Sequence, residues 1–177
     1  GLDSRAVLSF ARPGDAMSFG SRAIQGIGDV NGDGFADVIV MGNSGYVYLG
    51  SDHFDGQRPD AVIRAPVGVG PYGPYPSEFG IPVAAPADFN GDGYGDVAIS
   101  DSCAEATVLG CGSGRVYIFS GSSAGLSTTP SRTIEGPEIP DVHRIGGYFG
   151  TVLGAGDFDG DGFDDLAVRD DWSRDML

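Results

Sequence analysis

The chain has 177 residues, of which 25 are acidic and ten are basic, and its formal net charge is −15. This charge argues that the protein binds neither nucleic acids nor anionic membrane surfaces, because binding to either needs positive surface charge. Glycine accounts for 31 residues, well above its usual share of about 7%. The chain also has no apolar run near the roughly 20 residues that a membrane-spanning helix requires. These features predict one turn-rich, all-β domain with a core of its own.

The predicted elements recur in chain order as a repeating unit. A Phe-Gly pair opens each unit, an acidic glycine-rich loop follows, and a short β-branched run comes directly after the loop. Such runs predict strands at residues 38–41, 97–99 and 166–168. Aromatic-aliphatic runs then predict third strands at 46–49 and 115–119, and fourth strands at 61–64 and 131–134. We interpret the alternating aromatic residues of the third strands as sheet packing. Four short strands per repeat are typical of the blades of a β-propeller.

The acidic loops share the frame D-x-[ND]-G-D-G-x-x-D and begin at Asp29, Asp88 and Asp157. This spacing around a glycine bend directs oxygen ligands to a single centre, and glycine at the sixth position adopts positive φ without strain. A flexible, carboxylate-rich cage suits calcium better than magnesium. The predicted ligands, with the seventh residue contributing its carbonyl oxygen, are Asp29, Asn31, Asp33, Phe35 and Asp37 in the first loop, Asp88, Asn90, Asp92, Tyr94 and Asp96 in the second, and Asp157, Asp159, Asp161, Phe163 and Asp165 in the third.

Two alternatives to a calcium loop followed by a strand bear on this hypothesis. A metal-free hairpin rich in Asx turns is one, but its converging carboxylates would repel one another at neutral pH. An EF-hand is the other, and it needs a glutamate at position 12 followed by a helix. Position 12 here is Val40, Ile99 or Val168, each within a predicted strand. The third loop has four carboxylates where the others have three and an asparagine, so we expect it to bind calcium most tightly.

The ends of the chain predict an incomplete propeller. We expect residues 1–18 to contain the last strand of a preceding blade, residues 19–78 and 79–148 to form two full units, and residues 149–177 to form a truncated third unit. A propeller needs at least about four blades to close. The prediction is therefore a partial propeller that missing sequence or other chains complete.

Two cysteines, Cys103 and Cys111, flank a turn-forming stretch and predict a disulfide in an oxidising compartment. Two free thiols are the alternative, and a zinc site is weaker because no second Cys or His pair is near. The histidines, His53 and His143, lie in different predicted loops, and no G-x-S-x-G elbow occurs. We therefore expect no catalytic site in this chain.

The order Phe79-Gly80, the loop Asp88–Asp96 and the run Gly114–Gly121 (GRVYIFSG) resembles the FG-GAP repeat of integrin α-chain β-propellers. The resemblance implies calcium in the loops and an extracellular or cell-surface module for protein or glycan binding or adhesion. An alternative is an accessory propeller region of a secreted, phospholipase-like hydrolase whose catalytic domain lies elsewhere. A dockerin-like calcium module is a further alternative, and it requires a helix after each loop.

Overall fold

The computed structural model describes residues 9–14, 18–66, 78–81, 83–104, 112–137, 149–151 and 153–170. These residues form strands, bends and turns, with no helix among them. The described residues therefore contain no helix that could cross a membrane. The all-β prediction is confirmed, and strands follow each acidic loop. This excludes the EF-hand and dockerin-like alternatives.

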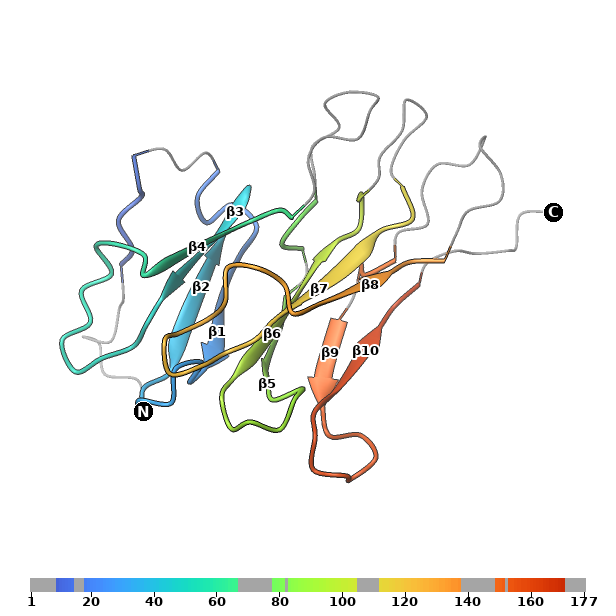
Figure 1. The fold of residues 1–177 in the computed structure, drawn as a ribbon. Helices are drawn as coiled ribbons and strands as arrows, with labels where there is room; N and C mark the ends of the chain where they lie inside the picture. Colours follow the sequence, from blue (N-terminus) through green and yellow to red (C-terminus); the bar gives the residue numbers. More distant parts are fainter. Residues whose placement is uncertain are drawn as a thin grey trace, which may run out of the picture.

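Ten strands form two four-stranded antiparallel sheets and one two-stranded pair among the described residues. The two sheets and the pair lie side by side in the order in which they occur in the sequence (Figure 1). The first sheet contains β1 (Ala23–Gly28), β2 (Asp37–Met41), β3 (Ser44–Tyr48) and β4 (Ala61–Arg64). The second contains β5 (Val83–Ala87), β6 (Asp96–Asp101), β7 (Arg115–Phe119) and β8 (Arg132–Glu135). The pair consists of β9 (Leu153–Gly156) and β10 (Asp165–Val168). Each strand predicted after residue 18 coincides with one of these within one or two residues.

The two full sheets share one register. Val38 pairs with Tyr48 in the first sheet, and Val97 pairs with Phe119 in the second. In both sheets the register also shifts just before the acidic loop, between Gly26 and Gly28 in β1 and within the end of β5. A bulge at this point bends the strand and turns it into the loop. Equivalent residues of the two sheets can therefore be compared directly.

The hydrophobic core lies between neighbouring sheets, because side chains alternate between the two faces of each strand. Ile39 and Met41 of β2 face the second sheet, where they join Ile99 and Phe119 in one buried cluster. The opposite face of the second sheet, which carries Val116, packs against the β9–β10 pair. The inner strands β1, β5 and β9 are neighbours in succession. This is how adjacent blades pack in a β-propeller, and the chain forms part of one.

The Phe-Gly pairs pack on the aromatic third strands, between the sheets in the second unit and on the outer face of the first sheet in the first unit. Phe79 is fully buried, with its ring centroid 6.0 Å from that of Tyr117 and 6.4 Å from that of Phe119. Phe19 makes the equivalent contact with Tyr46 at 5.3 Å. The interpretation of Tyr46, Tyr48, Tyr117 and Phe119 as sheet packing is confirmed, since all four are buried.

Several sequence predictions fall outside the described residues. These are Cys111, His143 and most of the segment 1–18 in which the last strand of a preceding blade is expected. Cys103 is described and buried, but its pairing with Cys111 stays a prediction.

Candidate metal centres

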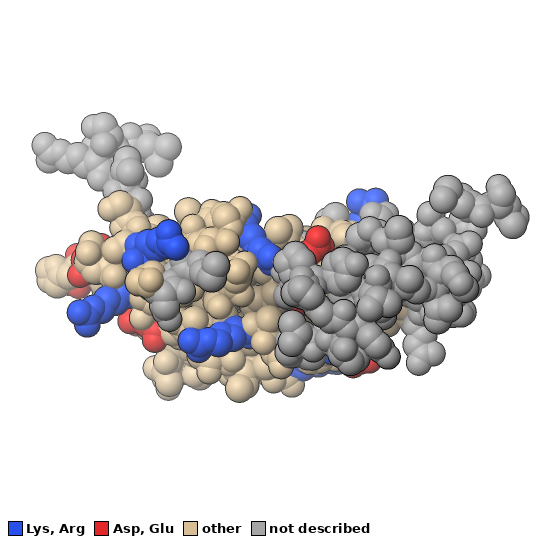
Figure 2. Space-filling model, turned by 90° about the horizontal axis from the view of Figure 1, so that it is seen from above, with Lys and Arg blue, Asp and Glu red and all other residues tan. Residues whose placement is uncertain are grey.

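The three acidic loops lie at one end of the sheets, each connecting the first two strands of its unit (Figure 1). Seen from above, the described part of the opposite end carries arginine side chains together with acidic ones (Figure 2). The loops themselves concentrate aspartates at their own end of the sheets, and this gives the loop end a field that attracts cations.

The first aspartate of each loop is held by backbone amides. Oδ1 of Asp29 accepts hydrogen bonds from the amides of Gly32 at 2.6 Å and Asp33 at 3.1 Å, and Oδ2 accepts one from Gly34 at 2.8 Å. Gly32 and Gly34 have φ of 73° and 91°, which turns these amides inward and favours glycine. The hydrogen bond from Gly34, with those from its neighbours, lowers the pKa of Asp29. Asp88 and Asp157 accept the same three bonds.

The third position differs between the loops, and with it the hydrogen bond to the aspartate at the fifth position. In the first loop, Nδ2 of Asn31 donates to Oδ2 of Asp33 at 2.8 Å, and Asn90 makes the same bond to Asp92 at 2.9 Å. The asparagine amide thus supplies a donor beside a carboxylate. In the third loop this position is Asp159, and an ionised carboxylate can only accept hydrogen bonds. It therefore provides no such donor.

The ninth position anchors each of the first two loops to its sheet. Asp37 is fully buried, and its Oδ2 and Oδ1 accept hydrogen bonds from the amides of Val30 at 2.8 Å and Gly50 at 2.6 Å. Asp96 is bound in the same way by Phe89 and Gly121. Burial raises the pKa of both carboxyls, and the charges of the loop's other aspartates add to the effect.

The glycines that follow the third strands are therefore part of the loop structure. The sequence shows a glycine at this point in both full units, Gly50 and Gly121. It does not show that their amides reach back to the ninth-position aspartate, 13 residues away for Gly50 and 25 for Gly121. The only indication in the sequence is that a glycine recurs directly after the third strand of both full units.

In the third loop, one carboxylate oxygen from each of Asp157, Asp159 and Asp165 lies within 4.8 Å of the others. Oδ2 of Asp165 also accepts a hydrogen bond from the amide of Phe158 at 3.0 Å. Among the described residues this is the only such cluster of three acidic, His or Cys groups. The structure thus brings together three of the four carboxylates predicted for this loop. An all-oxygen set of this kind fits a hard cation such as calcium.

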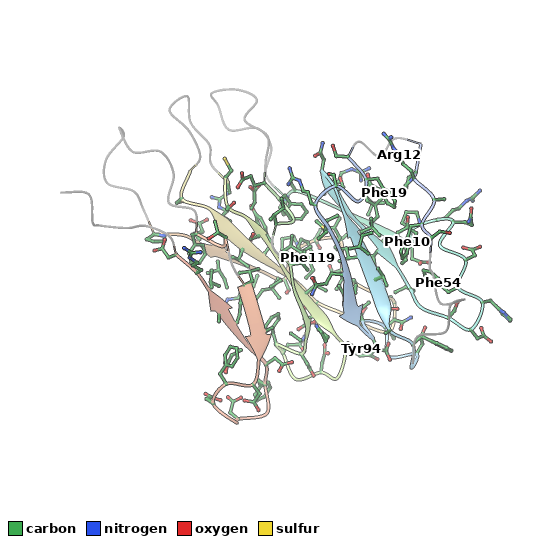
Figure 3. All side chains as sticks on the ribbon, turned by 180° about the vertical axis from the view of Figure 1, so that it is seen from behind. Phe10, Arg12, Phe19, Phe54, Tyr94 and Phe119 are labelled. Atoms are coloured by element: carbon green, nitrogen blue, oxygen red, sulfur yellow. The ribbon has the colours of Figure 1, made fainter. Side chains whose placement is uncertain are left out.

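Neighbouring loops are also bound to one another. The amide of Gly95 donates to the carbonyl of Asp29 at 3.0 Å, and the amide of Asp164 donates to that of Asp88 at 3.1 Å. A Cβ added to Gly32 would lie 2.8 Å from Cε1 of Tyr94, so the ring of Tyr94 packs directly on the preceding loop (Figure 3). Phe163 packs in the same way on Gly91. The seventh residues of the second and third loops, predicted only as carbonyl ligands, thus have a packing role for their side chains.

Comparison with known proteins agrees with this repeat. The FG-GAP repeat model matches residues 82–119 and 149–172. Integrin alpha-PS5 of Drosophila melanogaster is 34% identical over 152 residues, which cover 79% of this chain and 14% of that protein. Human integrin alpha-7 is 29% identical over 177 residues, covering 93% of this chain and 13% of the relative. Integrin alpha-IIb of the mouse is 33% identical over 154 residues. The chain therefore spans a small part of the length of these relatives.

Proposed function

This chain carries FG-GAP repeats and is homologous to integrin α chains, and from this premise we propose that it is a non-catalytic, extracellular β-propeller module with calcium in its loops and a protein ligand. The homology supports the extracellular, adhesion-type role. The calcium assignment is supported by the carboxylate cluster of the third loop, formed by Asp157, Asp159 and Asp165. This cluster is the observation that carries the calcium part of the proposal.

Calcium in these loops would be structural. The residues that would hold it are the first, third, fifth and ninth side chains of each loop, together with the seventh carbonyl. The ion would supply positive charge among carboxylates that otherwise repel one another. Two of the ninth-position aspartates also tie their loops to a glycine beyond the third strand. Calcium binding would therefore stabilise the sheet connections, because the site does not exist in the unfolded chain.

Native mass spectrometry and thermal unfolding of the chelated protein test the calcium proposal. We expect three calcium ions per chain and a higher melting temperature on adding calcium, with a smaller effect of magnesium. One site at a calcium concentration of 100 times its Kd adds about 2.7 kcal/mol. For a domain of this size that raises the melting temperature by roughly 5–10 °C.

Matched variants link the effect to the loops. Asp157→Asn should reduce the count of bound calcium by one and lower the calcium-dependent rise. Asp52→Asn removes the same charge from an exposed side chain outside the loops and should leave both unchanged. The absence of bound calcium and of any calcium-dependent stabilisation would contradict the proposal.

The binding role requires a separate measurement. The immobilised chain is exposed to a panel of purified extracellular proteins, with calcium and with a chelator. We expect at least one protein to bind in calcium, and soluble chain to compete for it. Binding to none, by a chain that folds and binds calcium, would contradict the adhesion role while leaving the calcium proposal intact.

The predicted disulfide between Cys103 and Cys111 belongs to the same proposal, because an extracellular protein folds in an oxidising compartment. Alkylation before and after reduction, followed by mass spectrometry, tests it. Labelling of both cysteines without reduction would contradict the disulfide.

A further inference from the structure

Asp164, the eighth residue of the third loop, contacts the second loop through both its side chain and its backbone. Its Oδ2 accepts a hydrogen bond from the amide of Asp88 at 2.7 Å, and its own amide donates to the carbonyl of Asp88 at 3.1 Å. One residue thus binds both backbone polar groups of Asp88, the first candidate ligand of the second loop. The loop frame does not predict this contact, because the two residues are 76 positions apart.

The preceding residue of the third loop acts on the same candidate ligand. A Cβ at Gly91 would collide with the ring of Phe163, so the ring lies directly on Gly91. The amide of Gly91 in turn donates to Oδ1 of Asp88 at 2.7 Å. Phe163 therefore restricts a residue that orients the carboxylate of Asp88, while Asp164 fixes the backbone of Asp88. The direction of this carboxylate depends on both contacts.

Among the described residues, the second loop alone receives both a ring and a carboxylate from another loop. The first loop receives the ring of Tyr94 on Gly32, and the amide of Gly95 donates to the carbonyl of Asp29 at 3.0 Å. Glycine at this eighth position has no side chain that could accept a hydrogen bond from the amide of Asp29. In the third loop, a Cβ at Gly160 would meet nothing within 4 Å. The first loop thus serves as an internal comparison without the carboxylate contact.

Asp164 is also tied to the third candidate site, because two predicted ligands of that site flank it. The carbonyl of Phe163 comes before it and the carboxylate of Asp165 comes after it. An oxygen of Asp165 already lies within 4.8 Å of oxygens of Asp157 and Asp159. A cation held by these oxygens would restrict the backbone on both sides of Asp164. Less conformational entropy would then remain to be lost when Asp164 fixes the second loop.

We propose that Asp164 is a positioning residue that couples the second and third calcium sites, so that calcium in the third loop strengthens binding in the second. This inference rests on the calcium part of the proposed function. The coupling is reciprocal, because the occupancy of either site changes the affinity of the other by the same factor. The first site has no carboxylate contact of this kind and is coupled less to its neighbour.

A calcium titration followed by NMR tests the coupling, because the amides of Gly34, Gly93 and Gly162 report the three sites separately. Each is the sixth residue of its loop and donates to the first aspartate of that loop. Asp157→Asn removes a charged ligand from the third site. We expect this variant to lower the calcium affinity of the second site at least about fivefold and to change that of the first by less than about twofold.

Two variants of Asp164 separate the hydrogen bond from the charge. Asp164→Ala removes the acceptor for the amide of Asp88, so the second site should weaken at least about fivefold. Adding Asp157→Asn to this variant should then leave the second site unchanged, as a double-mutant cycle measures. Asp164→Asn removes the charge but keeps an oxygen that accepts the same hydrogen bond, so it should restore most of the affinity. An unchanged first site shows that each variant is folded.

Three results would overturn the coupling while leaving calcium binding itself intact. They are a second site that Asp157→Asn does not weaken, equal losses in Asp164→Ala and Asp164→Asn, and a second site that still responds to Asp157→Asn after Asp164→Ala. Absence of calcium from the second and third loops of the unchanged chain would overturn the calcium assignment together with this proposal.

Discussion

The ring of Tyr94 lies against Gly32, one loop earlier in the chain, so closely that a Cβ at Gly32 would be 2.8 Å from Cε1 of the ring. Phe163 makes the same contact with Gly91. The glycine at the fourth loop position therefore has two roles. Its positive φ forms the turn, and its missing side chain makes room for the aromatic residue of the next loop.

Alanine substitutions at Gly32 and Gly160 separate these two roles. Both glycines have positive φ, 73° and 79°, so alanine at either position costs about 1–2 kcal/mol in backbone strain. Gly32→Ala also forces the Tyr94 ring to move, which adds about 1–3 kcal/mol. We expect urea denaturation to show the larger loss of unfolding free energy for Gly32→Ala.

A double-mutant cycle with Tyr94→Ala provides the control. Once the ring is removed, Gly32→Ala should cost no more than Gly160→Ala, because only the backbone strain remains. Equal costs for Gly32→Ala and Gly160→Ala in the unchanged background would contradict a packing role for Tyr94.

The sequence predicts the strands and the loops well because both have a local signature. The β-branched run after each loop becomes β2, β6 or β10, and the aromatic run becomes β3 or β7. Contacts between units have no such signature. The loop motif predicts only the carbonyl of Tyr94 as a ligand and not the contact of its ring, because the ring meets Gly32, a residue 62 positions earlier. The reach of the Gly50 amide to Asp37 likewise depends on the strand pairing that folds β3 back onto β2.

The two phenylalanines of the Phe-Gly pairs should differ in their contribution to stability. Phe79 is fully buried between the two full sheets, in contact with Tyr117 and Phe119. Phe79→Ala should therefore lower the free energy of unfolding by about 3–5 kcal/mol. Phe19 is only half-buried and contacts Tyr46 at the outer face of the first sheet, so Phe19→Ala should cost about half as much.

Thermal or urea unfolding of the two variants at equal protein concentration measures this difference. Phe19→Ala serves as the matched control, because it removes the same side chain from the equivalent position. A cost for Phe19→Ala as large as that for Phe79→Ala would show that the outer face of the first sheet is packed as tightly as the core between the sheets.

The third loop position sets the charge of each candidate calcium site, and exchanging its residue should exchange the behaviour of the loops. In the first loop, the amide of Asn31 donates to Asp33. In the third, an oxygen of Asp159 lies within 4.8 Å of oxygens of Asp157 and Asp165. Asp159→Asn removes one carboxylate from that cluster and should weaken calcium binding there roughly tenfold, because affinity follows the number of charged ligands. Asn31→Asp should strengthen binding in the first loop by a similar factor.

The chelated protein should respond in the opposite direction. Without a cation the extra carboxylate only adds repulsion, so Asp159→Asn should raise the melting temperature in chelator and Asn31→Asp should lower it. Calorimetric calcium titration and thermal unfolding in chelator measure the two effects, with the exposed Asp52→Asn as the control of equal charge change. Net charge alone would shift Asp159→Asn and Asp52→Asn in the same direction and Asn31→Asp in the other. An effect on stability that changes sign when calcium is removed, and that occurs only in the two loop variants, therefore identifies the third position as the determinant. A third loop that binds calcium more weakly than the first would refute this ranking.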